Sequence, residues 1–207
     1  MAPRCERCRM LETLCLCPVT PSLPTRTRLV VVMHVAERNK SSNTARLLTN
    51  ALPNSETRYQ GERDRTLDCS GLTDPTRETW LLFPETGNRV VTPADVAALT
   101  RPVTLIVPDG TWSQAKRIAG HVTRETGARR VTIPDMGPSR YRLRVGQKPH
   151  HLCTLEAVAR LLGMLESGAV QTELEKLLDR MVERVLFTRA KLPRGTTAAG
   201  LVSGRRG

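Results

Sequence analysis

The chain has 207 residues, 39% of them hydrophobic, which is enough for one domain of ordinary size with a buried core. Its 32 lysines and arginines outnumber 20 aspartates and glutamates, and a net charge of +12 favours a nucleic-acid partner. Aromatic residues make up only 3%, no hydrophobic run approaches a membrane span, and the first residues lack a signal-peptide core, which favours nucleic acid over a membrane surface as the partner. We expect a cytoplasmic protein without a membrane partner.

Four of the six cysteines fall within the first 17 residues, in the spacing Cys5-x2-Cys8-x6-Cys15-x-Cys17. In a reducing cytosol such a quartet favours a tetrahedral zinc site over two disulfides, because four thiolates can replace the water shell of the ion. Four protein ligands leave no open coordination position, so the role would be structural. A redox pair and incidental thiols stay open as alternatives. We expect a zinc-binding segment over residues 1–25.

The next part of the chain alternates between hydrophobic runs and helical patterns. Residues 28–34 (RLVVVMH) predict a buried strand, and residues 43–52 (NTARLLTNAL) have helical spacing. Residues 60–76 are polar and predict a loop, whereas residues 79–83 (TWLLF) predict a second buried strand. The pair Thr92-Pro93 predicts the start of a short helix.

The second half continues the alternation. It predicts a strand over 103–107, a helix over 111–121, a short strand over 130–133, a basic loop over 134–151 and helices over 154–166 and 173–190. Continuous hydrophobic strands that alternate with helices predict an α/β fold with a parallel sheet covered by helices on both faces. We expect this domain to span 26–192 and the Gly/Arg-rich tail, 193–207, to be disordered.

The unusual residues gather in the loops that follow the strands, and ligands of parallel sheets bind where those loops converge. Asp109 and Trp112 stand there, at a turn from strand to helix. Asp109 has two interpretations: a helix cap, or a carboxylate that acts as a base or as a charge partner for a cationic ligand. Trp112 either stacks on a ligand or fills the edge of the sheet.

The stretch Asp109-Gly110-Thr111-Trp112 resembles the D-x-T-W signature of the DTW-domain proteins. Further blocks are similar to the family and occur in its order: the cysteine cluster, H-x-x-E-R at 34–38, N-T-x-R-L at 43–47, L-F-P at 82–84, Tyr141 with Arg144, and C-T-x-E-A at 153–157. Val35 stands where the family has a proline after the first histidine. The resemblance covers about residues 5 to 165.

The resemblance implies transfer of the 3-amino-3-carboxypropyl group of S-adenosylmethionine to N3 of a uridine in tRNA, with release of methylthioadenosine. It also implies a SPOUT-like fold with a C-terminal trefoil knot, formed by the strands at 103–107 and 130–133 with the loop after them. S-adenosylmethionine would be the co-substrate, and Zn2+ a structural ion. Two alternatives stay open: a SPOUT-type RNA methyltransferase, and a zinc-containing RNA-binding protein without catalysis. SPOUT-like enzymes are often dimers, whereas this family favours a monomer, and the sequence leaves the oligomeric state open.

The resemblance, the strand-end loops and the charge pattern together give the expected site residues. Those expected in catalysis are Asp109, Thr111 and Trp112. Those expected to bind S-adenosylmethionine are Phe83, Pro84, Glu85, Pro108, Asp109, Trp112, Cys153, Thr154 and Glu156. Those expected to bind tRNA are Glu37, Arg38, Asn43, Thr44, Arg46, Arg140, Tyr141, Arg142 and Arg144. Arginines in the basic loop are expected to contact phosphates, and a solvated surface is the alternative.

Overall fold

The fold is built on a six-stranded sheet in the order β2-β1-β5-β3-β6-β4, and every neighbouring pair is parallel. The computed structural model describes residues 2–63, 65–85, 87–143, 151–190 and 196–203. The strands are β1 (Arg28–His34), β2 (Ser55–Gln60), β3 (Glu78–Leu82), β4 (Arg89–Val90), β5 (Val103–Asp109) and β6 (Arg129–Thr132). The helices are α1 (Ala45–Ala51), α2 (Pro93–Ala97), α3 (Trp112–Thr126), α4 (Thr154–Leu165), α5 (Gly168–Thr188) and α6 (Ala198–Ser203). The predicted α/β class with a parallel sheet is confirmed.

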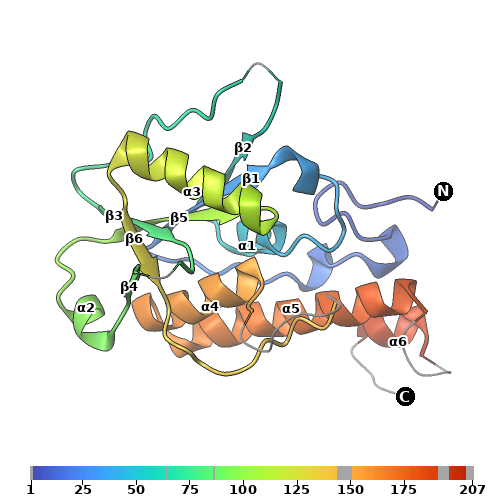
Figure 1. The fold of residues 1–207 in the computed structure, drawn as a ribbon. Coiled ribbons are helices and arrows are strands. Elements are labelled where there is room, and N and C mark those ends of the chain that lie inside the picture. The colour runs from blue at the N-terminus through green and yellow to red at the C-terminus, as the bar shows by residue number, and fades with distance from the viewer. Residues whose placement is uncertain (1, 64, 86, 144–150, 191–195, 204–207) are drawn as a thin grey trace.

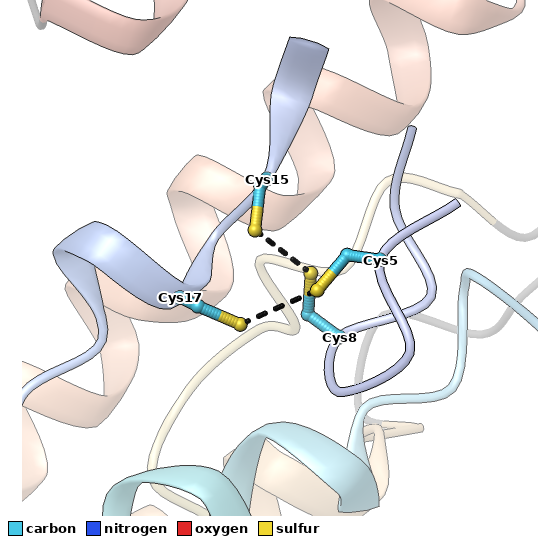
Figure 2. A group of neighbouring side chains, drawn as sticks. All are labelled: Cys5, Cys8, Cys15 and Cys17. Carbon is cyan, nitrogen blue, oxygen red and sulfur yellow. Dashed lines mark hydrogen bonds between the residues drawn. The ribbon is translucent and has the colours of Figure 1, made fainter. Parts of the chain in front are cut away.

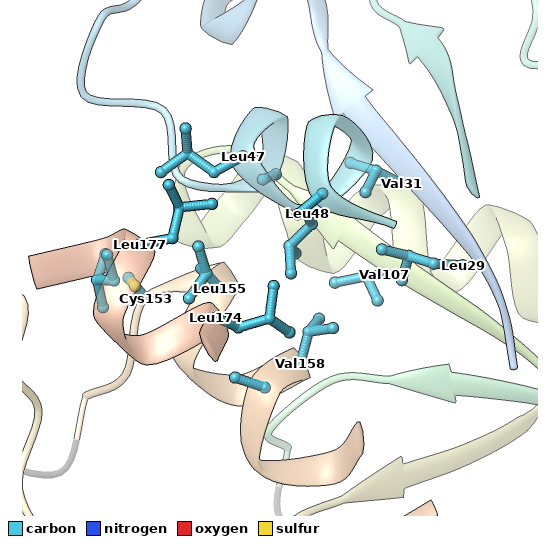
Figure 3. Close-up of a cluster of buried hydrophobic side chains, with 14 of the residues drawn as sticks. Leu29, Val31, Leu47, Leu48, Val107, Cys153, Leu155, Val158, Leu174 and Leu177 are labelled. Atoms are coloured by element: carbon cyan, nitrogen blue, oxygen red, sulfur yellow. The ribbon is translucent and has the colours of Figure 1, made fainter. Parts of the chain in front are cut away.

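Helices cover both faces of the sheet, as Figure 1 shows. Because side chains alternate along a strand, Val30 and Val32 of β1 pack in the cluster with α3, and Leu29 and Val31 face α1, α4 and α5. Figure 3 shows the hydrophobic cluster on the face covered by α1, α4 and α5. There Leu48, Leu155 and Leu174 belong to the same cluster as Leu29 of β1 and Val107 of β5. Hydrophobic residues on both faces explain why the central strands have continuous hydrophobic sequences.

Two strands were not predicted, and neither has a continuous hydrophobic sequence. β2 (SETRYQ) is an edge strand that pairs only with β1, and all six of its residues are half-buried. β4 has two residues and lies at the opposite edge, next to β6. An edge strand buries little side-chain surface, so the hydrophobic pattern that predicts central strands is weak there.

The ends of the C-terminal helices also differ from the prediction. α5 begins at Gly168 rather than 173, with the Ser167 hydroxyl accepting a hydrogen bond from the N–H of Val170. The tail expected to be disordered contains α6, which packs against α5 and the first N-terminal turn. None of the described helices is long and apolar enough to cross a membrane.

The N-terminal segment is packed onto the sheet domain. It contains two short 3-10 turns, η1 (Glu12–Leu14) and η2 (Cys17–Val19), and its Met10 and Leu16 belong to the same buried cluster as the sheet. Arg184 of α5 is almost completely buried, and its guanidinium donates hydrogen bonds to the carbonyl oxygens of Leu14 (3.2 Å) and Cys15 (2.5 Å). The segment over 1–25 therefore shares a core with the rest of the chain.

The segment expected to form a knot is described in part. β5 and β6 lie on either side of β3. Residues 144–150 of the loop after β6 lie outside the described residues, so the knot stays a prediction.

Candidate active site

A cavity of about 830 Å³ opens at the carboxyl ends of the strands. Its walls are the loop after β1, the ends of β3 and β5, the start of α3, the loop after β6 and the start of α4. This is the edge at which a parallel sheet binds its ligands, because the loops after the strands converge there. The volume lies in the range of pockets that enclose small molecules.

Asp109 is the last residue of β5, and its carboxylate lies at the meeting point of three segments. It is only 6% exposed. One carboxylate oxygen accepts a hydrogen bond from the Asn43 amide before α1, and the other accepts one from the Thr154 hydroxyl at the start of α4, both at 2.6 Å. The interpretation of Asp109 as a helix cap is wrong: Thr111 is the N-cap residue of α3, and its N–H donates to the Gln114 side chain at 2.8 Å. Asp109 instead presents a positioned carboxylate to the cavity.

Trp112 lies on the wall of the same cavity and is 61% exposed. Its ring stacks on the ring of Phe83, with the centroids 5.1 Å apart and the planes 30° from parallel. The interpretation of Trp112 as a plug at the sheet edge does not hold, because a plug would be buried. An exposed indole supported by a buried phenylalanine is a platform on which a flat ligand can stack.

Twelve of the predicted site residues line this cavity. They are Glu37, Asn43, Thr44, Phe83, Pro84, Pro108, Asp109, Thr111, Trp112, Tyr141, Cys153 and Thr154. The spacing of these residues in the sequence is large, and the loops at the carboxyl edge bring them together.

Two predicted cofactor-binding acids are engaged elsewhere. Glu156 is buried and accepts hydrogen bonds from the Ser139 hydroxyl and from the backbone N–H groups of Arg140 and Cys153. Glu85 forms ion pairs with Lys116 and Arg130, and the hydrogen bond from Lys116 lowers its pKa. Neither carboxylate lines the cavity in the described structure, so Asp109 is the better candidate for direct contact with a ligand.

In the basic loop, Arg140 is engaged by acids of the protein itself. Arg140 forms ion pairs with Glu175 and Asp179 of α5, and the hydrogen bond to Asp179 raises its pKa. Its charge is therefore compensated, and Arg140 anchors the loop to α5. Arg142 is exposed, and Arg144 lies outside the described residues.

Two arginines that were not predicted as site residues, the buried Arg160 and the exposed Arg189, shape the wall after β6. Arg160 of α4 is 6% exposed and donates to the carbonyl oxygens of Gly137 and Pro138, each at 3.0 Å. Arg189 donates to the carbonyl oxygen of Leu143 at 3.2 Å. Arg160 could have been recognised from the sequence, because it stands within the hydrophobic helix TLEAVARLLGML and a buried guanidinium requires hydrogen-bond partners.

Figure 2 shows the four N-terminal cysteines gathered in a second cluster. None of them lines the cavity. All four sulfur atoms lie within 4.8 Å of one another, with Cys5 Sγ 3.6 Å from Cys17 Sγ and Cys8 Sγ 3.8 Å from Cys15 Sγ. Sulfur atoms at about 2.3 Å from a tetrahedral zinc ion would be roughly 3.8 Å apart, so the quartet fits such an ion. None of the four is in a disulfide, and they could hold a metal.

These features define an α/β protein with a cavity of small-molecule size at the carboxyl edge of a parallel sheet and with a cysteine cluster that could hold a metal. The chain belongs to the DTW domain family, whose domain matches residues 2–186. The family expected from the motifs is confirmed.

Known proteins similar to this chain carry consistent names. The tRNA-uridine aminocarboxypropyltransferase 2 of Drosophila melanogaster is 32% identical over 184 residues, which cover 86% of this chain and 71% of the relative. The enzyme of the same name from Macaca fascicularis is 32% identical, over 80% of this chain and 57% of its own length. The solved structure of the SAM-dependent rRNA:acp-transferase Tsr3 from Vulcanisaeta distributa aligns with a TM-score of 0.50 and 20% identity, over 86% of this chain and 87% of that one. This last likeness is one of fold.

Proposed function

We propose that the protein transfers the 3-amino-3-carboxypropyl group of S-adenosylmethionine to N3 of a uridine in tRNA and releases methylthioadenosine. The proposal is supported by membership of the DTW domain family and by relatives named tRNA-uridine aminocarboxypropyltransferase. The observation that carries it in the structure is the D-x-T-W turn itself, which presents a buried carboxylate and an exposed indole to one cavity.

Orientation in the cavity decides which bond of S-adenosylmethionine is broken. Its sulfonium activates both the methyl carbon and the γ-carbon of the methionine chain, and the carbon that faces the nucleophile reacts. The protein therefore acts mainly by positioning. The described walls contain rigid elements suited to this task, namely the end of β5 and the first turns of α3 and α4.

Asp109 is proposed as the base that accepts the N3 proton of uridine. An anion next to the sulfonium would stabilise the substrate more than the transition state, since the positive charge disappears as the bond to sulfur breaks. Removal of the N3 proton, by contrast, creates the nucleophile and raises the rate. Asn43 and Thr154 would act as positioning residues, because each donates a hydrogen bond to one oxygen of this carboxylate.

Trp112 is proposed as the stacking platform for the adenine of the co-substrate or for the target base. Trp112→Ala should weaken binding of one of these two ligands by about 1–3 kcal/mol, or roughly 5- to 150-fold. The melting temperature should change little, because the indole is mostly exposed. Calorimetry with S-adenosylmethionine and fluorescence anisotropy with tRNA identify the ligand, and Trp112→Phe should restore part of the affinity. Unchanged affinity for both ligands would remove the stacking role.

The cysteine quartet is proposed to hold one structural Zn2+. Four thiolate ligands would complete its coordination and leave no position for a substrate. The ion would stabilise the N-terminal turns against α5, where Arg184 contacts the carbonyl oxygens of Leu14 and Cys15. We also propose a SPOUT-like knot in the C-terminal part of the sheet. The zinc-binding segment would span residues 1–25, and the catalytic domain residues 26–192.

A labelling experiment separates this activity from methyl transfer. With unmodified tRNA, label in the aminocarboxypropyl chain of S-adenosylmethionine should enter the RNA, and label in its methyl group should not. The reverse result would make the protein a methyltransferase. No transfer of either label, with tRNA still bound, would favour the non-catalytic RNA-binding alternative.

A further inference from the structure

A second, smaller pocket of about 200 Å³ lies between the N-terminal segment and the edge of the sheet formed by β1 and β2. Four arginines and one acid are among its lining residues, which are Glu6, Arg7, Arg9, Met33, Arg38, Arg46, Thr49, Thr57 and Tyr59. The pocket therefore has a strong excess of positive charge. Neither the fold nor the cavity at the carboxyl edge explains this concentration.

In the described part of the chain, these arginines have few carboxylate partners. Among the described residues, no carboxylate lies within ion-pair distance of Arg7, Arg9 or Arg46, and Arg38 contacts Glu62 at 3.7 Å. Burial lowers the pKa of Arg46 and the nearby positive charge of Arg9 lowers it further, whereas Tyr59, Cys8 and Asp109 act in the opposite direction. Positive charges held close together repel each other, and an anion bound between them removes that repulsion.

The cysteine turn places two of these arginines. Arg7 and Arg9 flank Cys8, whose buried thiol belongs to the quartet. Arg9 has a φ of 59°, in the left-handed region that few residues other than glycine adopt, and its N–H donates to the carbonyl oxygen of Cys5 at 2.8 Å. The turn over residues 5–9 thus places Cys5 and Cys8 in the quartet, and Arg7 and Arg9 at the pocket.

The other two arginines connect the pocket to the active-site cavity. Glu37 and Asn43 line the cavity, whereas Arg38 and Arg46 of the same segment line the second pocket. The Arg46 guanidinium donates to the Arg38 carbonyl oxygen, and the Arg38 guanidinium lies 4.7 Å from the centre of the Tyr59 ring. The cavity and the second pocket are therefore lined by neighbouring residues of one segment.

We propose that this pocket binds a phosphodiester group of the tRNA backbone close to the target uridine. The inference rests on the proposed function for the identity of the RNA. Guanidinium groups suit this ligand, because their planar forks donate two parallel hydrogen bonds to phosphate oxygens. The pocket supplies such groups from two separate segments, the cysteine turn and the segment between β1 and α1.

The test removes the arginines of the turn and keeps its cysteines. Arg7→Gln combined with Arg9→Asn should weaken tRNA binding about 10-fold or more at low salt and reduce the slope of log affinity against log salt by about 1 to 2. Asparagine is chosen for Arg9 because it tolerates the left-handed conformation. Affinity for S-adenosylmethionine and the melting temperature should stay unchanged. Arg38→Gln, on the other wall, should weaken tRNA binding in the same direction.

The matched control removes the same charge from the exposed face of α3, by Arg117→Gln with Arg124→Gln. Equal losses of tRNA affinity in both double variants would overturn the proposal, since the loss of net charge alone would explain them. Loss of inorganic phosphate binding with unchanged tRNA affinity would also overturn it, because the site would then serve a free anion. If the variants lose tRNA affinity but the wild type transfers no aminocarboxypropyl group, the pocket stands and the proposed function fails.

Discussion

Asp109→Asn should lower kcat for transfer by about 100-fold or more while leaving the fold and the affinity for S-adenosylmethionine nearly unchanged. The asparagine can keep the local geometry, because its carbonyl oxygen can accept from the Asn43 amide, and its own amide can donate to the Thr154 hydroxyl after that hydroxyl rotates. What it loses is the ability to take a proton. Steady-state kinetics and calorimetry on the two proteins check the two halves of this expectation.

Asp109→Ala should behave differently, since it removes both acceptors. The Asn43 amide and the Thr154 hydroxyl would lose their shared partner, at a cost of about 1–3 kcal/mol in the free energy of unfolding for a buried group left unsatisfied. Denaturant unfolding measures this loss. Glu125→Gln, which removes one exposed carboxylate on α3, is the control for charge and should change neither quantity.

Three outcomes with the asparagine variant have different meanings. A large fall in kcat supports the role of Asp109 as the base. A fall in affinity for S-adenosylmethionine with kcat preserved would make Asp109 a charge partner for the sulfonium. Near-normal values of both would contradict any chemical role, and Glu37, which also lines the cavity, would become the next acid to test.

Removal of the metal from the cysteine quartet should destabilise much more than the N-terminal turns. Cys8→Ser or treatment with a chelator should lower the melting temperature by about 10 °C or more, because structural zinc contributes directly to folding. The effect should reach α5, since Met10 and Leu16 share its hydrophobic core and Arg184 hydrogen-bonds to the segment. Thermal unfolding monitored by circular dichroism measures the shift.

Metal analysis completes this test. The wild-type protein should contain one zinc ion per chain, and Cys8→Ser should contain much less. Cys69→Ser changes a cysteine outside the quartet and should leave both the metal content and the melting temperature unchanged. A metal-free wild type with the original melting temperature would contradict the structural role.

The sequence predicted the central elements because they are buried on both faces. β1 and β5 are continuous hydrophobic runs, and such runs between helical patterns identify parallel strands. Ligands bind where parallel strands end, so Asp109 could be predicted as a site residue from its place at the end of a hydrophobic strand. The edge strand β2 escaped prediction because its residues are polar and pair with β1 alone.

Tertiary contacts of polar residues could not be read from the sequence. Asp109 looked like a helix cap because it precedes α3 by three positions, yet its partners lie 66 and 45 residues away. Arg140 looked like a free charge because the acids that neutralise it are on α5, 35 and 39 residues further along. Local spacing does not show such partners, and the folded structure does.

Mass spectrometry of nucleosides from an unmodified tRNA transcript, incubated with the protein and S-adenosylmethionine, tests the central claim most directly. We expect one uridine to gain the mass of an aminocarboxypropyl group and an equal amount of methylthioadenosine to appear. The Asp109→Asn protein should form much less of both products in the same time. A methylated nucleoside with S-adenosylhomocysteine as the by-product would contradict the account.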